Sequence, residues 1–88
     1  MAQKKAIKFF ATWCGPCKIY GKTWEKVVTK FQDEIEFVDV DIEKDTTGLA
    51  AQYKISTVPT TVLVLANGST ESKSGRLNQT ELEEFLNQ

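Results

Sequence analysis

Four stretches of the chain have the sequence pattern of β-strands, namely residues 6–11, 35–42, 60–66 and 69–74. The first and third are apolar and rich in aromatic or β-branched residues, which predicts buried strands. The second alternates between two faces, one with Val38, Val40 and Ile42 and the other with Phe37, Asp39 and Asp41. The fourth is polar and follows Asn67-Gly68, a typical hairpin turn, which predicts an antiparallel edge strand.

Three other stretches predict helices. The first should begin at or just after Cys14, because Pro16 suits a first helical turn, and should end near Gln32. Its apolar residues recur at helical spacing and form a core face, namely Tyr20, Trp24, Val27, Val28 and Phe31. Residues 46–53 predict a short second helix.

A capping box formed by Asn78 and Glu81 predicts the last helix. Its core-facing residues are expected to be Leu82, Phe85 and Leu86. The order of elements is therefore βαβαββα, which is typical of one layered α/β domain over residues 1–88. The first two strands should be parallel because a helix connects them, and the last two antiparallel, so we predict a mixed four-stranded sheet.

Composition excludes several classes of function. The net charge of −1 favours neither a nucleic-acid partner nor a membrane surface, and no apolar run approaches the roughly 20 residues of a membrane helix. The first residues make a poor signal peptide because Lys8 interrupts a short apolar run, so we expect a cytoplasmic protein. The chain has no histidine, which excludes Cys–His and Ser–His catalysis and histidine metal ligands.

Cys14 and Cys17 are the only cysteines of the chain, and three interpretations of this pair are open. A structural disulfide would close a loop of four residues and stabilise the fold by only roughly 2 kcal/mol. A zinc site would need two more cysteine or histidine ligands, so it could form only between two chains. A redox pair is the third and favoured interpretation, because two residues three positions apart at a helix start need little motion to form a disulfide.

The two cysteines should differ in chemistry. Cys14 is predicted at the helix N-terminus, exposed, among unpaired N–H groups and the positive end of the helix dipole, which favour its thiolate. Cys17 lies one turn further, shielded, and should keep its proton longer. We therefore expect Cys14 to attack a substrate disulfide and Cys17 to resolve the mixed disulfide.

The segments ATWCGPCK and STVPT, followed by Asn67-Gly68 and Gly75, resemble the thioredoxin family over almost the whole chain. The resemblance implies a thioredoxin fold and protein-disulfide reductase activity, with no bound cofactor or metal besides the redox-active disulfide. It also implies that Pro59 is cis and that the backbone of Val58 pairs with an extended substrate. The implied substrate-binding rim consists of Trp13, Gly15, Pro16, Val58 and Gly75, with Arg76 at its border.

Two departures from the family concern the sheet and the surroundings of Cys17. The family usually has another strand and helix before the first strand identified here, so we expect the minimal arrangement with residues 35–42 as an edge strand. Lys8 also stands where the family has a buried aspartate, and Asp39 stands near a position that is often lysine. We hypothesise that Lys8 and Asp39 form an ion pair behind Cys17 that takes part in proton relay; alternatively, Lys8 extends to solvent.

Several functional interpretations follow from the resemblance. The favoured one is a monomeric reductase that acts on disulfide-bearing proteins and receives electrons from a thioredoxin reductase. The alternatives are a glutaredoxin-like enzyme that uses glutathione, and a binding subunit that does not use its thiols. Four lysines recur every four residues, at Lys18, Lys22, Lys26 and Lys30. They are either a solvated helix face or a docking surface for an acidic partner.

Overall fold

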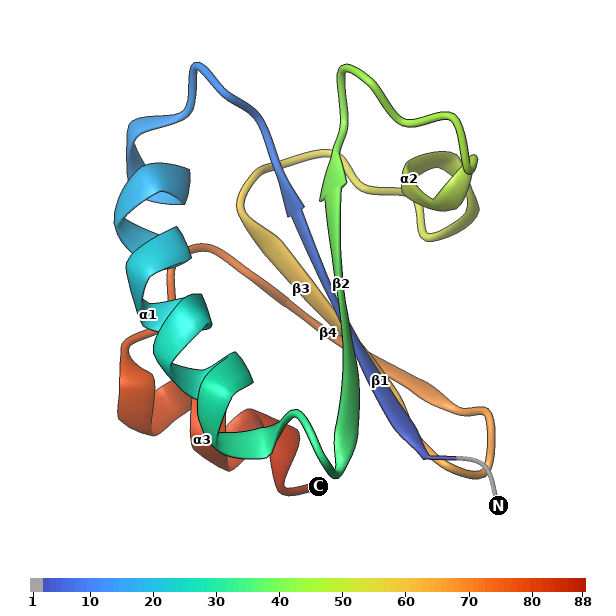
Figure 1. The fold of residues 1–88 in the computed structure, drawn as a ribbon. Coiled ribbons are helices and arrows are strands. Elements are labelled where there is room, and N and C mark those ends of the chain that lie inside the picture. The colour runs from blue at the N-terminus through green and yellow to red at the C-terminus, as the bar shows by residue number, and fades with distance from the viewer. Residues whose placement is uncertain (1–2) are drawn as a thin grey trace.

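The computed structural model describes residues 3–88 and contains the predicted order of elements (Figure 1). The elements are β1 (Lys4–Phe10), α1 (Gly15–Phe31), β2 (Ile35–Asp41), α2 (Leu49–Gln52), β3 (Thr60–Val64), β4 (Thr70–Ser74) and α3 (Gln79–Leu86). Among these residues, no helix is both long and apolar enough to cross a bilayer.

The four strands form one mixed sheet, as predicted, and their order is β2-β1-β3-β4. β1 pairs in parallel with β2 and antiparallel with β3, while β3 and β4 form the hairpin. β2 is an edge strand, also as predicted. The parallel register places Lys8 beside Asp39, so both side chains lie on the same face of the sheet.

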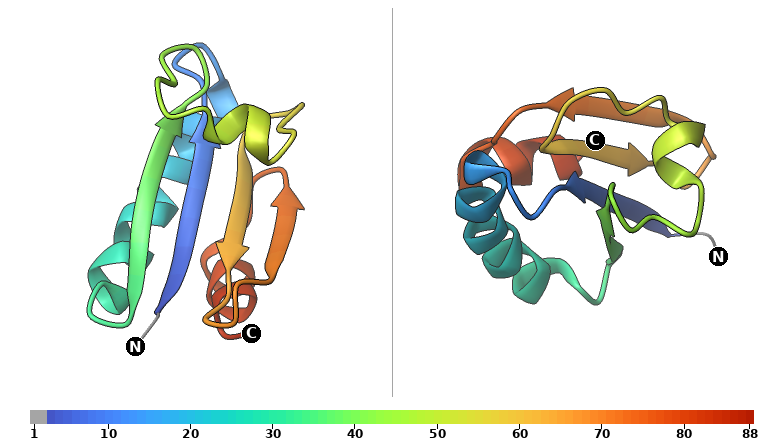
Figure 2. Two further views of the ribbon diagram at one scale, coloured as in Figure 1. Left: turned by 90° about the vertical axis from the view of Figure 1, so that its right-hand side faces the viewer. Right: turned by 90° about the horizontal axis from the view of Figure 1, so that it is seen from above.

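Helices cover the two faces of the sheet unequally (Figures 1 and 2). α1 and α3 lie together on one face, and the short α2 lies on the other. The core under α1 and α3 is the larger one, formed by Ala6, Tyr20, Trp24, Val27, Ile35, Leu63, Leu77, Leu82 and Leu86. On the opposite face the buried residues are Ile7, Phe9, Val40 and Val62.

The ends of α1 agree with the sequence prediction. Cys14 is the N-cap with extended backbone, Pro16 occupies the first turn, and Gln32 is the C-cap. The apolar stripe of α1 faces the sheet, where Trp24 packs edge-on against Phe37 with ring centroids 5.4 Å apart. Because this contact joins α1 to the edge strand β2, it fixes the helix over the parallel pair of strands.

The prediction of a helix over residues 46–53 was too long, since α2 contains only one turn. The carboxylate of Asp45 accepts hydrogen bonds from the backbone N–H groups of Thr47 and Ala50, which hold the preceding residues in a loop. Gly48 is the N-cap in a left-handed conformation with φ 78°, and Lys54 has φ 55° just after the helix. These left-handed residues stop helical propagation on both sides.

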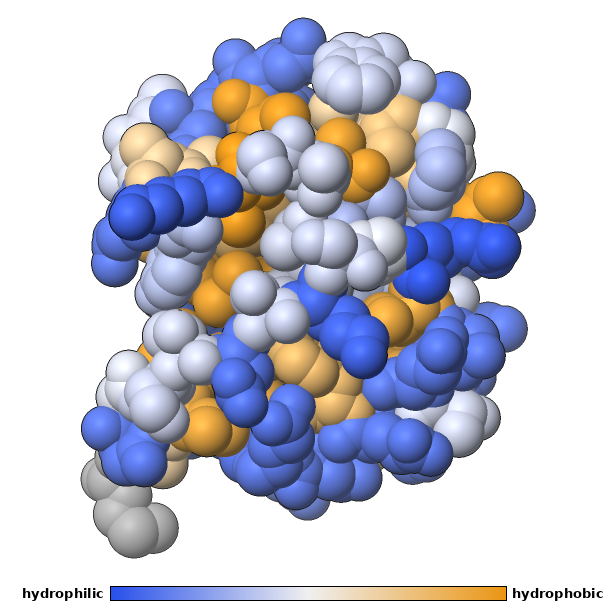
Figure 3. Space-filling model, turned by 180° about the vertical axis from the view of Figure 1, so that it is seen from behind, coloured by the Kyte–Doolittle hydropathy of each residue, from blue (hydrophilic) through white to orange (hydrophobic). Residues whose placement is uncertain are grey.

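The last strand and helix have polar outer surfaces. All five residues of β4 are exposed, in keeping with a polar edge strand. Figure 3 views the molecule from the side opposite to Figure 1 and shows mainly hydrophilic and intermediate side chains, with smaller hydrophobic areas between them.

The predicted capping box is present, because Glu81 N–H donates to Asn78 at 2.8 Å and Asn78 N–H donates to Glu81 at 2.9 Å.

Candidate active site

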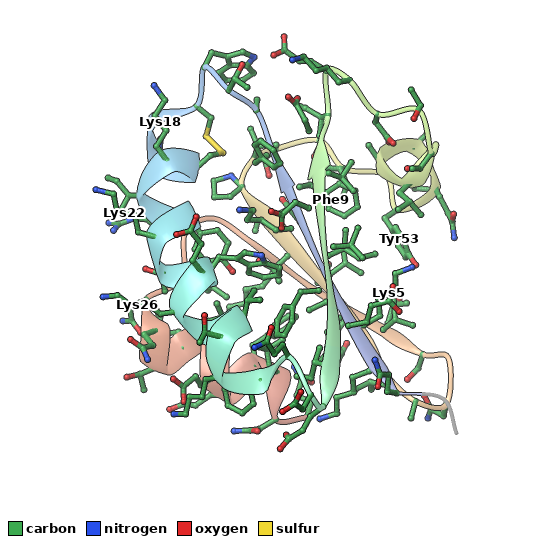
Figure 4. All side chains as sticks on the ribbon, in the orientation of Figure 1. Lys5, Phe9, Lys18, Lys22, Lys26 and Tyr53 are labelled. Atoms are coloured by element: carbon green, nitrogen blue, oxygen red, sulfur yellow. A yellow bond between two sulfur atoms is a disulfide. The ribbon has the colours of Figure 1, made fainter. Side chains whose placement is uncertain are left out.

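The two cysteines lie where β1 passes into α1. The chain turns after Phe10, and the N–H of Cys14 donates to the carbonyl of Ala11 at 3.2 Å. Cys14 and Cys17 are joined by a disulfide, with their Cα atoms 5.2 Å apart, and the S–S bond is visible at the start of α1 in Figure 4. Strand end and helix start together therefore place both sulfurs at one end of the sheet.

The sulfur of Cys14 is placed at the positive end of the helix. The backbone N–H of Cys17 donates to Cys14 Sγ at 3.2 Å, so the cysteine sulfur has the role that a serine or aspartate oxygen has in other N-caps. A hydrogen bond to the sulfur and the helix dipole both favour the thiolate over the thiol when the disulfide is reduced. This geometry suits a nucleophilic Cys14.

The expected difference in exposure between the two cysteines is wrong. Cys14 and Cys17 are each only 5% exposed, because both pack in a small cluster with Ala11 that Phe10, Ile42 and Val58 adjoin. The loops after β1 and β2 and the segment before β3 thus close around the disulfide. What distinguishes the two sulfurs in this structure is the N–H donor to Cys14, not access to solvent.

The Val58–Pro59 segment borders the disulfide. The Val58–Pro59 peptide bond is cis, and Pro59 is buried. The carbonyl oxygen of Val58 lies 3.7 Å from Cys14 Sγ, and the carbonyl of Pro59 accepts a 2.8 Å hydrogen bond from the N–H of Gly75. The structure therefore brings the cysteine loop, the segment before β3 and the residue after β4 together.

The other residues of the predicted rim are on the surface. Trp13 is 67% exposed, and Gly15, Pro16 and Arg76 are also exposed. Sequence reasoning missed Ile19, which is 53% exposed and lies one turn from Pro16 in α1. Trp13 and Ile19 are the two large apolar side chains exposed on residues 3–88, and both lie close in sequence to the cysteines. Ile19 lies outside the apolar stripe of α1, and this position in the sequence could have identified it as an exposed apolar residue.

Lys8 and Asp39 are close, although their environments differ. Lys8 Nζ lies 3.8 Å from Asp39 Oδ2, and the exposed fractions of the two side chains are 9% and 54%. The ammonium group also lies over the rings of Phe10 and Trp24, at 5.2 Å and 5.6 Å from their centroids. Lys8 therefore does not extend into solvent, and it meets Asp39 at the edge of the buried region.

A second buried polar contact was not predicted. The hydroxyls of Tyr20 and Thr61 are 2.6 Å apart and link α1 to β3. Burial raises the pKa of Tyr20 to about 12, while its hydrogen bond with Thr61 acts in the opposite direction. Both residues were expected only as parts of apolar segments, and a pairing across 41 positions leaves no local signal in the sequence.

The four lysines of α1 do not all have the same surroundings. Lys18, Lys22 and Lys26 point away from the sheet in Figure 4. Lys30, at the end of α1, forms a 2.8 Å ion pair with Glu83 of α3, and its hydrogen bond lowers the pKa of Glu83. Lys30 thus links the two helices, and the other three lysines form what we call the lysine row.

Within residues 3–88, no group of three or more cysteine, aspartate or glutamate residues could hold a metal ion. The zinc interpretation of the cysteine pair therefore finds no further ligands in the part of the chain that the structure describes.

Comparison with known proteins gives the family. A family model described as Thioredoxin matches residues 1–88. The chain belongs to the thioredoxin family. It is 46% identical over 81 residues to the mitochondrial thioredoxin of Bos taurus, a match that covers 91% of this chain and 48% of the relative. The chain thus spans about half the length of that relative.

Other thioredoxins match over more of their length. The thioredoxin of Mycoplasmoides gallisepticum is 32% identical over 84 residues, which is 96% of this chain and 82% of the relative. The X-ray structure of Fasciola hepatica thioredoxin superposes with a TM-score of 0.86 at 30% identity, covering 98% of this chain and 80% of that chain. The predicted thioredoxin fold in its minimal form is confirmed.

Proposed function

We propose that the protein is a thiol–disulfide oxidoreductase that reduces protein disulfides through a Cys14/Cys17 dithiol–disulfide cycle. The observation that carries the proposal is the sulfur of Cys14 at the N-cap of α1, which accepts the N–H of Cys17 and is bonded to the sulfur of that residue. Membership of the thioredoxin family supports the same activity.

The cycle has two exchanges of sulfur partners. The Cys14 thiolate attacks one sulfur of the substrate disulfide, forms a mixed disulfide, and expels the other substrate sulfur as a thiolate. Cys17 then loses its proton to water and attacks Cys14 Sγ, which breaks the mixed disulfide and releases the second substrate thiolate. Two electrons pass from the cysteine pair to the substrate, and the two released thiolates take up protons from water.

The substrate is proposed to bind as an extended segment beside Val58. The half-buried Val58 borders the disulfide, Gly75 is hydrogen-bonded to the neighbouring Pro59, and Trp13, Gly15 and Pro16 add exposed surface. Backbone pairing at Val58 would align an extended peptide without requiring a particular side chain, which suits a reductase with many protein substrates. A thioredoxin reductase is the proposed electron donor, and the cytoplasmic location stays a prediction.

The test is reduction of a disulfide-linked protein such as insulin, with thioredoxin reductase and NADPH as the source of electrons. The Cys14→Ser variant should lose the activity, and the Cys17→Ser variant should accumulate a mixed disulfide with the substrate. Reduction of the oxidised protein by glutathione but not by the reductase would favour the glutaredoxin-like alternative. Full biological activity of the double serine variant would favour the binding subunit.

The lysine row favours the binding of substrates that have acidic surfaces. Lys18, Lys22 and Lys26 project outward from the helix that bears the cysteines, and Arg76 is exposed next to Gly75. Replacing the three lysines with glutamine should raise the KM for an acidic disulfide substrate and leave the KM for a neutral one unchanged. The effect should weaken as salt is added, and a KM that does not depend on salt would contradict the docking role.

A further inference from the structure

Lys8 is a buried cation on the face of β1 that α1 covers. Its side chain is 9% exposed, whereas lysine is almost never buried unless it has a partner. The carboxylate of Asp39 is 3.8 Å away, longer than a direct hydrogen bond, and is itself 54% exposed. The remaining close contacts are the ring faces of Phe10 and Trp24. The solvated Asp39 therefore leaves the positive charge only partly compensated.

Lys8 lines the same hollow as the resolving cysteine. A hollow of about 360 Å³ next to the start of α1 is lined by Lys8, Phe10, Ala11, Thr12, Cys17, Lys18 and Gly21. A Cβ atom built on Gly21 would lie 3.9 Å from Lys8 Nζ. Cys17 and Gly21 are one helical turn apart, a spacing of about 5–6 Å between Cβ positions. Lys8 therefore places its charge at most about 10 Å from the Cβ atom of Cys17, on the wall of the same hollow.

We propose that Lys8 is a positioning residue that stabilises the thiolate of Cys17 and thereby makes the cysteine pair a weaker reductant and a faster resolver of mixed disulfides near neutral pH. The redox consequences rest on the proposed function. A cation beside a thiol favours its ionised form, and the low local dielectric strengthens the effect. Lys8 acts on the substrate only through Cys17.

Other charged groups around Lys8 modify the effect without cancelling it. On β2, Asp39 and Asp41 lie on the same face as Lys8 and Phe10. On α1, Lys18 lines the hollow that contains Cys17, and Glu25 lines a neighbouring hollow with Asp39. β3 contributes the uncharged Thr61 opposite Lys8. Asp39, Asp41 and Glu25 oppose Lys8, but Lys18 adds to it, and Lys8 is the most deeply buried of these charged groups.

The chemical balance shows where the charge acts. The Cys17 thiol gives its proton to water, and the resulting thiolate attacks Cys14 Sγ and releases the substrate thiolate. Stabilising the Cys17 thiolate lowers the free energy of the reduced protein, whereas the disulfide has no such charge to stabilise. The reduction potential therefore rises wherever Cys17 is ionised, and more Cys17 is ready to attack at neutral pH.

The direct test is a titration of Cys17 alone. A Cys14→Ser variant keeps an N-cap side chain and leaves one thiol, whose ionisation is followed by the ultraviolet absorbance of the thiolate. In this background Lys8→Met should raise the pKa of Cys17 by about 1, and Lys8→Arg should restore most of the difference. Lys5→Met is the matched control, since Lys5 is on the same strand but on the opposite face, with Phe9 and Tyr53 (Figure 4). It should leave the titration unchanged.

Asp39→Asn gives a second, independent measurement, because Asp39 is on the surface and its replacement should not disturb folding. Removing the opposing carboxylate should lower the pKa of Cys17, whereas loss of a proton relay would leave this pKa unchanged and slow resolution. If Lys8→Met does not fold, the titration of Cys17 in the Asp39→Asn variant tests the proposal instead. A pKa of Cys17 that is the same in all folded variants would overturn the proposal.

The redox consequence is measured by equilibration of the two-cysteine protein with glutathione. At alkaline pH, Lys8→Met should favour the disulfide about tenfold, which corresponds to about 30 mV for a two-electron couple, and the difference should vanish at acidic pH. Resolution at neutral pH should slow by about threefold, since the higher nucleophilicity of a more basic thiolate offsets part of its lower abundance. The titration requires no substrate, so inactivity of the wild-type protein on disulfides would reject the proposed function without affecting this result.

Discussion

Both faces of the sheet contain fully buried residues, but different elements cover them. On one face, side chains of α1 and α3 fill the space, and the cysteine pair lies at the start of α1. On the other face, Ile7 and Phe9 are just as inaccessible, but α2 is one turn long and most of the cover comes from loops. The first face thus couples stability to the site, whereas the second depends on local loop hydrogen bonds.

The largest effect should come from removing the central side chain of the α1 face. Trp24 is 2% exposed and packs against Tyr20 and Phe37. Trp24→Ala should reduce the free energy of unfolding by about 3–5 kcal/mol, measured by urea denaturation. The matched control Trp13→Ala, at a site 67% exposed, should change it by less than about 0.5 kcal/mol. Similar losses in both variants would contradict this view of the core.

A smaller loss is expected at the hydroxyl pair of this face. Tyr20→Phe leaves the buried Thr61 hydroxyl without its partner, which should cost about 1–3 kcal/mol. The double variant Tyr20→Phe, Thr61→Val removes both polar groups and should recover most of the loss. The pKa of Tyr20 is raised above its unfolded value, so its contribution to stability is lost as pH rises from about 10 to 12. Stability should fall less steeply over that range in Tyr20→Phe.

The corresponding change on the α2 face should be milder. Tyr53 is half-buried and packs its ring against Phe9 with centroids 6.2 Å apart. Tyr53→Ala should lower the free energy of unfolding by about 1–2 kcal/mol, because part of the ring is already in solvent. Tyr53→Phe retains the ring pair and serves as control. A loss as large as that of Trp24→Ala would show that α2 contributes more than its length indicates.

The smallest effect should appear at Asp45, which organises the loop before α2. Hydrogen bonds to its carboxylate lower the pKa of Asp45. The bond from the Thr47 side chain has the largest effect, and the bond from the N–H of Ala50 comes next. A lowered pKa contributes stability at neutral pH that is lost as pH falls through the acidic range. Asp45→Asn should therefore flatten the dependence of the melting temperature on acidic pH. Thr47→Val should flatten it partly, and an unchanged slope in both variants would contradict the role.

Sequence reasoning succeeded where the determinants of structure are local. The start of α1 follows from Cys14 and Pro16, and the start of α3 from the pair Asn78 and Glu81, all within one helical turn. Local patterns and the rules of chain connection gave the parallel first pair and the antiparallel hairpin, whereas the edge position of residues 35–42 came from the family resemblance. The length of α2 was overestimated, although an aspartate before two threonines and a glycine is itself a turn signal.

The environment of the site was harder to predict because it depends on packing between distant segments. The closure of Ile42 and Val58 around the sulfurs, and the contact between Tyr20 and Thr61, join residues far apart in the chain. The sequence indicated that Lys8 and Asp39 could meet on neighbouring strands. The resemblance also placed this pair behind Cys17, but the burial of Lys8 there depends on how closely α1 approaches β1 at Gly21, which leaves no local signal.

The burial of both sulfurs limits which molecules can reach them. Cys14 and Cys17 are covered by apolar side chains from three segments, so under the proposed function a folded substrate would have to present its disulfide on a protruding segment to reach Cys14. The same cover would hinder the approach of peroxides, which oxidise exposed thiolates first to sulfenic acid and then, irreversibly, to sulfinic acid. Under the proposed function, selection of accessible substrate disulfides and protection from oxidation would therefore share one structural cause, the burial of both sulfurs.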